Sequence, residues 1–292
     1  MKSKTKKKIA FLGTGLMGQP MAERLLARGY PLVAFNRTRQ KAERLESAGA
    51  AIADDPRDAV AQAQCVILML AHAQAVQEVL LSQEVAAELR GRTVIQMSTI
   101  SSTQSLEICR RVEAAGGEYL EAPVLGSIPQ VLEGQLIVMV GATPRLYENW
   151  VEVFQCLGSR TYLVGPPGKA AALKLALNQL IASLTAGFAL SLGIVQRAGI
   201  DVELFMKILR GSALHAPTFE KKLSRMISRD FDNPNFPVRL LLKDINLALE
   251  EAGGLGTAGL QGIRTVVEKT VAEGFAEIDY SAIFNTIVPE MS

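Results

Sequence analysis

The chain has 292 residues, a length that suits one large domain or two of ordinary size. With 49% hydrophobic residues, 21% charged residues and a net charge of +2, it has the composition of a soluble globular protein and no electrostatic attraction to nucleic acid or to an anionic membrane. Its three cysteines and two histidines are widely spaced, so we expect reduced thiols in a cytoplasmic protein, without a disulfide framework or a metal site.

An apolar run at residues 9–12 predicts a buried strand, and a glycine-rich turn follows it. Gly13, Gly15 and Gly18 have the G-x-G-x-x-G spacing of dinucleotide-binding sites, and a helical pattern continues from them to Gly29. Gly13 is expected to permit the turn, Gly15 to let the backbone approach a pyrophosphate, and Gly18 to let the helix pack closely on the sheet. The phosphates would lie at the helix N-terminus. The cofactor contacts expected in this turn are Gly13, Thr14, Gly15, Leu16, Met17 and Gly18.

The second predicted strand, residues 32–35, ends in Asn36, Arg37 and Thr38. Sites that prefer NAD usually carry Asp or Glu here, about 20 residues beyond the glycines, to bind the ribose 2′-hydroxyl. This sequence has neither. Arg37 instead offers a planar cation for a 2′-phosphate, and Thr38 adds a hydroxyl donor. We therefore expect NADP(H) as the cofactor; the alternative is that Arg37 is an exposed turn residue.

Strands and helices alternate through the rest of the first half. The predicted strands are residues 65–70, 93–97, 119–120 and 135–140, and the predicted helices are residues 39–48, 74–81 and 103–115. Hydroxyl side chains at residues 98–102 follow a strand, where doubly wound sheets bind ligands, and they are also suited to cap the next helix. The alternation predicts an α/β fold of the Rossmann type, a doubly wound and mostly parallel sheet, as far as about Val164.

Beyond the Gly-Pro-Pro-Gly break at residues 165–168, the sequence shows helical periodicity and no good strand. The predicted helices are residues 169–198, 201–210, 217–228, 238–252, 257–273 and 279–287. We therefore expect two domains: an NADP-binding Rossmann domain at residues 1–165, and an all-α domain for substrate binding and dimerisation at residues 166–292.

The long helix that enters the second domain has no charged residue between 175 and 196, a length sufficient to cross a bilayer. It also contains several amide and hydroxyl side chains. We expect it to be buried between domains, or between subunits of a homodimer or homotetramer, and not to lie in a membrane.

Lys174 and Asn178 lie four residues apart near the start of the long helix, so they share one face of it. Hydride transfer to a carbonyl group leaves an alkoxide, which needs a proton donor beside it. A lysine removed from water next to an amide is suited to this, because burial lowers the pKa of an ammonium group. Either these residues are catalytic, or Lys174 is an interface lysine whose charge is satisfied by its neighbours.

Taken together, the motifs resemble those of the β-hydroxyacid dehydrogenase family, in their usual order along nearly the whole chain. They are G-x-G-x-M-G-x-x-M-A at 13–22, N-R-T at 36–38, S-T-I-S at 98–101, A-P-V-x-G-S at 122–127, Gly168 followed by Lys174 and Asn178, and Lys243-Asp244. Within the family, the N-R-T and P-V-x-G-S patterns most resemble glyoxylate/succinic semialdehyde reductases, with 3-hydroxyisobutyrate dehydrogenases and tartronate semialdehyde reductases as near relatives.

The resemblance implies a role for each matching residue. Lys174 would protonate the carbonyl oxygen, and Asn178 would orient Lys174 or the substrate. Thr99 would lie near both the nicotinamide and the substrate. Gly126 and Ser127 would offer hydrogen-bond donors to the substrate carboxylate.

In the helical half, the resemblance implies that Lys243 contacts the cofactor, while Asp244 and Phe236 frame the substrate pocket. The alternatives are core packing for Phe236 and a helix-surface ion pair for Lys243 and Asp244. The expected cofactor site also includes Leu70 and Ala71, at the end of the strand predicted at 65–70.

One position departs from the family pattern. Leu125 stands where the family usually has Ser, in the loop that grips the substrate carboxylate. Leu cannot donate a hydrogen bond, so a site built around that donor would lose about 1–3 kcal/mol of recognition. Either Ser127 and backbone N–H groups suffice, or the substrate is bulkier or less polar than glyoxylate.

We therefore expect an enzyme, an NADPH-dependent reductase that transfers a hydride to a small aldehyde acid or 2-oxo acid. The alternatives are a 3-hydroxyisobutyrate or tartronate semialdehyde type of dehydrogenase, an imine reductase, and a non-catalytic NADP-binding protein. Imine reductases share the architecture but typically lack the helix lysine, and Lys174, Asn178 and Thr99 together argue against a retired site. A methyltransferase would want an acidic residue after the second strand.

Overall fold

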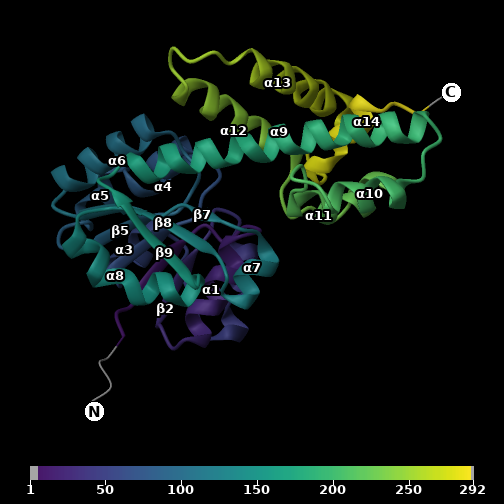
Figure 1. Cartoon of the computed structure of the whole chain (residues 1–292). Helices are drawn as coiled ribbons and strands as arrows, with labels where there is room; N and C mark the ends of the chain where they lie inside the picture. The colour runs from purple at the N-terminus through teal and green to yellow at the C-terminus, as the bar shows by residue number, and fades with distance from the viewer. Residues whose placement is uncertain (1–5, 291–292) are drawn as a thin grey trace. The chain divides into compact units, whose positions relative to one another are not determined.

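The computed structural model describes residues 6–290 (Figure 1). The chain folds into two compact units, Met1–Lys174 and Leu175–Ser292. The point of division lies inside the long helix α9 (Lys169–Arg197). The domain boundary expected between residues 165 and 166 stays a prediction. Each unit has its own buried core and is described separately below.

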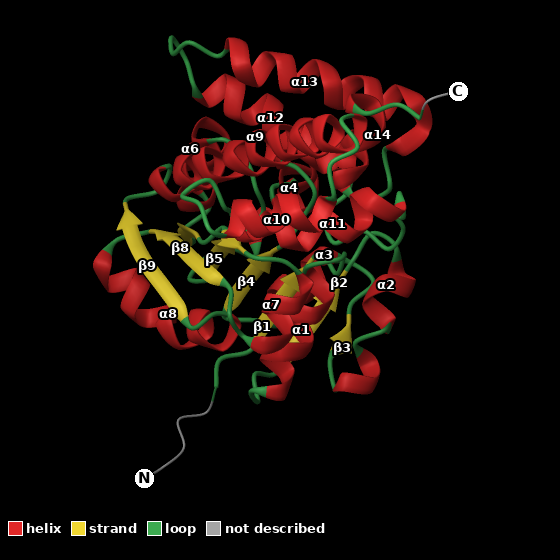
Figure 2. Ribbon diagram, turned by 45° about the vertical axis from the view of Figure 1, so that its right-hand side comes forward, coloured by secondary structure: helices red, strands yellow, loops and turns green. Residues whose placement is uncertain are grey.

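The strands of the first unit form one sheet, shown in yellow in Figure 2, in the order β3-β2-β1-β4-β5-β6-β8-β7, with β9 paired to β8. Neighbours from β3 to β6 are parallel, while β8 runs antiparallel to both β6 and β7. The strands are β1 (Ile9–Leu12), β2 (Leu32–Phe35), β3 (Ala51–Ile52), β4 (Cys65–Leu68), β5 (Thr93–Gln96), β6 (Glu118–Glu121), β7 (Val124–Leu125), β8 (Ile137–Gly141) and β9 (Arg160–Gly165). This mostly parallel sheet confirms the predicted α/β fold.

Helices cover both faces of this sheet because its central strands are apolar on both sides. In β1, Ile9 and Phe11 pack with α1 and α8 in one buried cluster, and Ala10 and Leu12 pack with α3 to α6 in a second. The helical segments are α1 (Gly18–Ala27), α2 (Arg39–Glu43), η1 (Glu46–Ala48), α3 (Pro56–Ala61), α4 (Ala73–Leu80), α5 (Gln83–Ala87), α6 (Ser102–Ala114), α7 (Ile128–Glu133) and α8 (Pro144–Leu157).

Several short elements of the first unit differ from the sequence prediction. The helix expected at 39–48 is α2 followed by the separate 3₁₀ turn η1, which ends where Gly49 has a φ of 94°. Residues 51–61, for which no element was expected, form the two-residue strand β3 and the six-residue helix α3, whose Asp55 cap accepts a hydrogen bond from Arg57 N. Elements this short carry too few residues for a periodic apolar pattern.

The regular secondary structure in the described residues of the second unit is helical, apart from one isolated bridge between Pro237 and Asp279. Its segments are the remainder of α9, α10 (Val202–Arg210), α11 (Pro217–Ser228), α12 (Val238–Glu251), α13 (Ala258–Thr270), η2 (Val271–Phe275), η3 (Tyr280–Ala282) and α14 (Ile283–Ile287). The bounds of α9 to α12 agree closely with the predicted helices, because each has an apolar stripe at helical spacing and a Gly or Pro near its ends. The helix predicted at 257–273 is α13 followed by the π-helical segment η2, and the one predicted at 279–287 is the 3₁₀ turn η3 followed by the short α14.

Helix α9 is long and apolar enough, by length and composition alone, to cross a membrane, and 39% of its most apolar 18-residue window is buried. One such helix is weak evidence for a membrane span, since the core helix of a soluble protein meets the same criteria. Leu180, Leu190 and Ile194 on this helix are about half exposed, at 47%, 54% and 59%. The expected homo-oligomer stays a prediction.

Candidate active site

The glycine turn after β1 has the geometry that its spacing predicts. Gly13 has a φ of +103°, which favours glycine, and the chain turns there between β1 and α1. A Cβ added to Gly18 would lie 1.9 Å from the carbonyl oxygen of Gly13, so only glycine lets the helix begin this close to the turn. A Cβ added to Gly15 would meet no atom within 4 Å. Gly15 therefore borders open space, as the predicted approach of a pyrophosphate requires.

The end of β2 is tied to the glycine turn by Asn36. Its side-chain oxygen accepts a hydrogen bond from Thr14 N at 3.2 Å, and its side-chain nitrogen donates to the carbonyl oxygen of Thr38 at 2.9 Å. Asn36 thus fixes both loops. The Thr14 hydroxyl is buried and has no hydrogen-bond partner among residues 6–290. An unpaired buried hydroxyl beside the turn fits a site where a ligand supplies the partner.

A cavity of about 390 Å³ opens beside this turn. Its lining includes Thr14, Gly15 and Leu16 of the turn, Lys41 of α2, and Arg44, the residue that follows α2. The sequence reasoning included Arg37, an exposed residue just before α2, but missed Lys41 and Arg44. The sequence signal for them was that Lys41 and Arg44 follow the N-R-T motif three residues apart, which is helical spacing. Together with the unpaired Thr14 hydroxyl, the open space at Gly15 and the helix N-terminus, these cations suit a dinucleotide that bears a further phosphate.

The ends of β4 and β5 are joined at the same edge of the sheet. Leu70 N donates to the Ser98 hydroxyl at 2.8 Å, and the buried Gln96 amide bonds both N–H and C=O of Ser98. These bonds hold the backbone on which Thr99 and Ala71 stand, next to the carboxyl ends of the strands. Ser101 caps α6 through Gln104 N, so the hydroxyl run includes a helix cap, one of its two expected roles.

Gly126 and Ser127 lie in the loop before the short helix α7. Gly126 has a φ of +134° and is exposed. The Ser127 hydroxyl and backbone N–H both donate to the side-chain oxygen of Gln130, at 2.8 and 2.9 Å. Ser127 thus caps α7 in this structure, and its predicted contact with a substrate carboxylate would require the hydroxyl to leave Gln130. Leu125, one residue before Gly126, is half-buried and pairs with Ile137 of β8.

Helix α9 begins over a buried carboxylate that the sequence reasoning did not single out. Glu121, at the end of β6, is 1% exposed, and its Oε1 accepts hydrogen bonds from Ala170 N at 2.8 Å and Ala171 N at 3.0 Å. The Ser105 hydroxyl donates to its other oxygen. A carboxylate is favoured at a helix N-terminus, where it satisfies free N–H groups and faces the positive end of the helix dipole. Glu121 therefore fixes the start of the helix that carries Lys174.

Lys174 lies at the sixth position of α9, and its side chain is buried, with 7% of the residue exposed. Lysine is rarely this buried, because its charge then needs neighbouring groups that accommodate it. Burial of Lys174 therefore marks it as a candidate functional residue. Asn178 follows one turn later on the same helix and is 4% exposed.

In the second unit, Asn178 and Asp244 are in contact. The Asn178 side-chain nitrogen donates to Asp244 Oδ2 at 2.6 Å, and Lys243 forms an ion pair with Asp244 Oδ1 at 2.8 Å. The Asn178 side-chain oxygen is buried and has no hydrogen-bond partner within the described part of the chain. Three predicted site residues are thus joined in one polar chain, which leaves a buried acceptor for a ligand. Phe236 is half-buried and its ring meets the Tyr280 ring edge to face.

Comparison with known proteins identifies the family. Residues 8–165 match the model of the NAD binding domain of 6-phosphogluconate dehydrogenase, and residues 168–287 match the model of the NAD-binding region of NADP-dependent 3-hydroxyisobutyrate dehydrogenase. The chain belongs to the β-hydroxyacid dehydrogenase family. It is an NAD(P)-dependent oxidoreductase of that type, which confirms the resemblance seen in its motifs.

Individual relatives agree with this assignment over nearly their full length. The chain is 32% identical to 2-hydroxy-3-oxopropionate reductase of Escherichia coli, covering 96% of this chain and 97% of that protein. It is 29% identical to glyoxylate/succinic semialdehyde reductase 1 of Arabidopsis thaliana, covering 96% and 98%. The structure of Mycobacterium tuberculosis 3-hydroxyisobutyrate dehydrogenase with L-serine superposes with a TM-score of 0.87 at 25% identity, covering 97% of this chain and 99% of that one.

Proposed function

We propose that this family member is an NADPH-dependent reductase of small aldehyde acids or 2-oxo acids, of the glyoxylate or succinic semialdehyde type, with Lys174 as the proton donor. The observation that carries the proposal is the buried lysine near the start of α9, whose helix is held at its first turn by Glu121. A hydride acceptor that becomes an alkoxide needs an acid at a fixed position, and a lysine on a well-anchored helix provides one.

The cofactor would be held by the glycine turn at residues 13–18, with its phosphates at the N-terminus of α1. Lys41 and Arg44, which line the cavity beside the turn, would bind the 2′-phosphate together with Arg37, which follows β2, and this supports NADPH over NADH. When bound, the reduced nicotinamide supplies the hydride. The protein's own part is to hold the carbonyl carbon in reach of that hydride and to place the Lys174 ammonium at the carbonyl oxygen.

The substrate carboxylate would be bound by donors at Gly126 and Ser127, with Thr99 beside the reacting carbon. Asn178 would accept a hydrogen bond through its unpaired side-chain oxygen, from the substrate or from the Lys174 ammonium, and Asp244 would hold that amide in place. Leu125 supplies no donor, so the substrate would be less polar on that side than one gripped by Ser. The E. coli and Arabidopsis relatives define the two substrate types to compare, tartronate semialdehyde against glyoxylate and succinic semialdehyde.

The test measures oxidation of NADPH and NADH with a panel of glyoxylate, succinic semialdehyde, tartronate semialdehyde, methylglyoxal and a cyclic imine. Lys174→Ala should lower kcat by about 10²–10⁴-fold, while the Kd for NADPH changes little. Lys169→Ala is the matched control, since this exposed lysine lies on the same helix and should keep wild-type kcat. A Lys174→Ala enzyme with wild-type turnover would remove the proton-donor role.

A further inference from the structure

Phe236 stands on a connecting segment that is paired with a second segment near the C-terminus. The segment runs from α11 to α12, and backbone bonds join it to residues 278–280. Asp279 N donates to Phe231 O at 2.9 Å, and Tyr280 N donates to Phe236 O at 2.9 Å. The segment that carries Phe236 therefore takes its path from the residues around Asp279.

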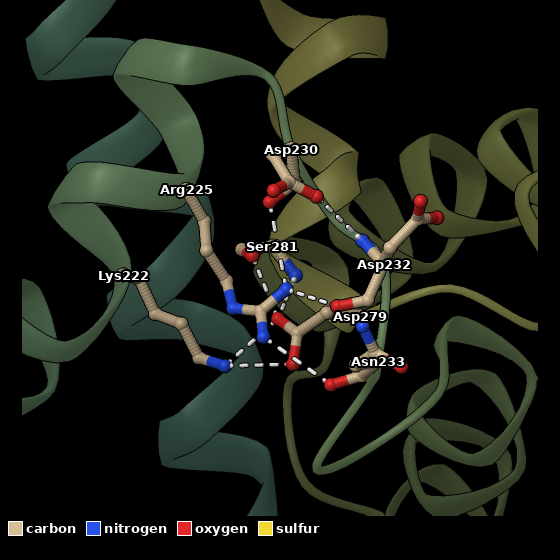
Figure 3. A network of polar contacts seen from close by, with 7 residues as sticks. All are labelled: Lys222, Arg225, Asp230, Asp232, Asn233, Asp279 and Ser281. Atoms are coloured by element: carbon tan, nitrogen blue, oxygen red, sulfur yellow. Dashed lines mark hydrogen bonds and ion pairs between the residues drawn. The ribbon is translucent and has the colours of Figure 1, made fainter.

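A buried ion pair lies beneath this pairing. Lys222 of α11 donates to both carboxylate oxygens of Asp279, at 2.8 and 2.9 Å, and the two residues are 7% and 0% exposed (Figure 3). Asp279 also accepts hydrogen bonds from the Ser281 hydroxyl at 2.6 Å and from Ser281 N at 3.1 Å. Burial lowers the pKa of Lys222, and the charge of Asp279 opposes that shift. The pair is thus fully enclosed and its hydrogen bonds fix its geometry.

The Tyr280 ring lies in contact with both the Lys222 ammonium and the Phe236 ring. Lys222 Nζ lies 4.2 Å from the centroid of the Tyr280 ring, a cation–π distance. The Tyr280 ring meets the Phe236 ring edge to face, with centroids 5.6 Å apart and planes at 67°. Lys222 and Asp279 therefore act on Phe236 by two routes, the paired backbone and the edge-to-face contact between the Tyr280 and Phe236 rings.

Arg225, one turn after Lys222 on α11, holds the outer part of the same segment. In Figure 3 its guanidinium faces the loop carbonyl groups, donating to Asp232 O at 2.7 Å and Asn233 O at 3.2 Å. Asn233 has a φ of 52°, an uncommon conformation for a residue other than glycine, which the surrounding bonds maintain. The segment is therefore held by Arg225 at residues 232 and 233, as well as by its backbone bonds to Asp279 and Tyr280.

A buried ion pair is a weak source of stability, since well-packed apolar residues often serve as well, but in some proteins such a pair fixes one arrangement of the groups around it. We propose that Lys222 and Asp279 are positioning residues that hold Phe236 in the orientation required for substrate binding. This rests on the proposed function and on the family resemblance, which implies that Phe236 frames the substrate pocket. The ion pair would then set substrate affinity without touching the substrate.

The experiment uses Lys222→Met/Asp279→Leu, which removes both charges together and leaves neither one buried alone. The KM for the best substrate of the panel should rise about 5–20-fold, the Kd for NADPH should stay within about twofold, and kcat should fall less than KM rises. Phe236→Ala should raise KM by a similar factor, and adding it to the double variant should raise KM no further. The matched control is Arg239→Met/Glu277→Gln, which removes an exposed ion pair at the start of α12 and should leave KM unchanged.

Should the double variant not fold, Tyr280→Leu tests the same step, since it removes the ring between the ammonium and Phe236 but keeps the ion pair. Wild-type KM in either variant, beside a raised KM in Phe236→Ala, overturns the positioning role and leaves the proposed function standing. An unchanged KM in Phe236→Ala removes Phe236 from the substrate site and overturns this inference, while the substrate panel and Lys174→Ala test the proposed function separately. Additive effects of Phe236→Ala and the double variant also overturn the positioning role.

Discussion

Glu121 offers the most direct test of how the first unit holds the long helix. Glu121→Ala removes the carboxylate that accepts from Ala170 N, Ala171 N and the Ser105 hydroxyl. The Ser105 hydroxyl can still bond to the Tyr119 hydroxyl, whereas the two backbone donors of α9 are left buried without an acceptor. Each donor left unpaired in a buried site costs about 1–3 kcal/mol, so the loss of two should lower the free energy of unfolding of this unit by about 2–6 kcal/mol. For a domain of this size that corresponds to a Tm lower by about 5–20 °C.

The assay is thermal unfolding followed by circular dichroism, with Thr143→Ala as the control. Thr143 caps α8 in the same unit through Leu146 N at 3.3 Å, and its loss should cost only about 1 kcal/mol. Glu121→Gln keeps the shape and one carbonyl oxygen, so its Tm should lie between those of Glu121→Ala and the wild type. A Tm for Glu121→Ala no lower than that of Thr143→Ala would refute the view that this carboxylate anchors α9.

Gly141 provides an independent check on the same interaction. A Cβ at Gly141 would lie 2.6 Å from Glu121 Cγ, so Gly141→Ala should destabilise the wild-type protein. In the Glu121→Ala background the side chain that it would strike is gone, and the second substitution should be tolerated. The coupling free energy from this double-mutant cycle should exceed about 1 kcal/mol. Simple additivity would show that the overlap at Gly141 is relieved elsewhere.

The cofactor site and the buried thiols allow three further predictions. Gly18→Ala forces a Cβ against Gly13 O, so it should lower the Tm and also lower NADPH affinity about tenfold. Gly15→Ala should lower NADPH affinity and leave the Tm unchanged, because its Cβ would enter open space. Arg37→Ala should raise the Kd for NADPH about tenfold in a fluorescence titration and that for NADH less than about twofold; equal losses would contradict a 2′-phosphate contact. Burial raises the pKa of Cys109 from 9.0 to about 12, so its contribution to stability is complete below pH 9 and is lost as the pH rises toward 12. The urea midpoint should fall over that range, and less steeply in Cys109→Ala.

The sequence predicted the fold best where one physical signal runs over many residues. The helices of the second unit repeat apolar positions at helical spacing for several turns, as Met206 and Leu209 do on α10. The central strands are unbroken apolar runs, as in β4. By contrast, β3 has two residues and β7 has two, and their pairing with β2 and β8 is decided by the sheet they join. A local pattern cannot report such pairing.

The same contrast applies to the candidate site. The glycine turn could be predicted because its requirements are local: a positive φ at Gly13 and a close approach at Gly18. Glu121 could not, because the N–H groups it accepts from lie about fifty residues away along the chain. Nor could the partner of Lys222 be found, since Asp279 comes from a distant segment. Residues that act through such long-range contacts show no spacing in the sequence.

The buried state of Lys174 also bears on the choice between carbonyl and imine reduction, which share this architecture. A ketone or aldehyde gains a hydride and becomes an alkoxide, so the enzyme must deliver a proton to oxygen. An iminium ion already carries its proton before the hydride arrives, and its product is a neutral amine that needs no acid. A lysine enclosed in protein, at 7% exposure, has a chemical use in the first reaction and none in the second. Loss of carbonyl reduction in Lys174→Ala, with any imine reduction retained, would follow from this difference; equal loss of both would mean that Lys174 acts by shaping the site and not by giving up a proton.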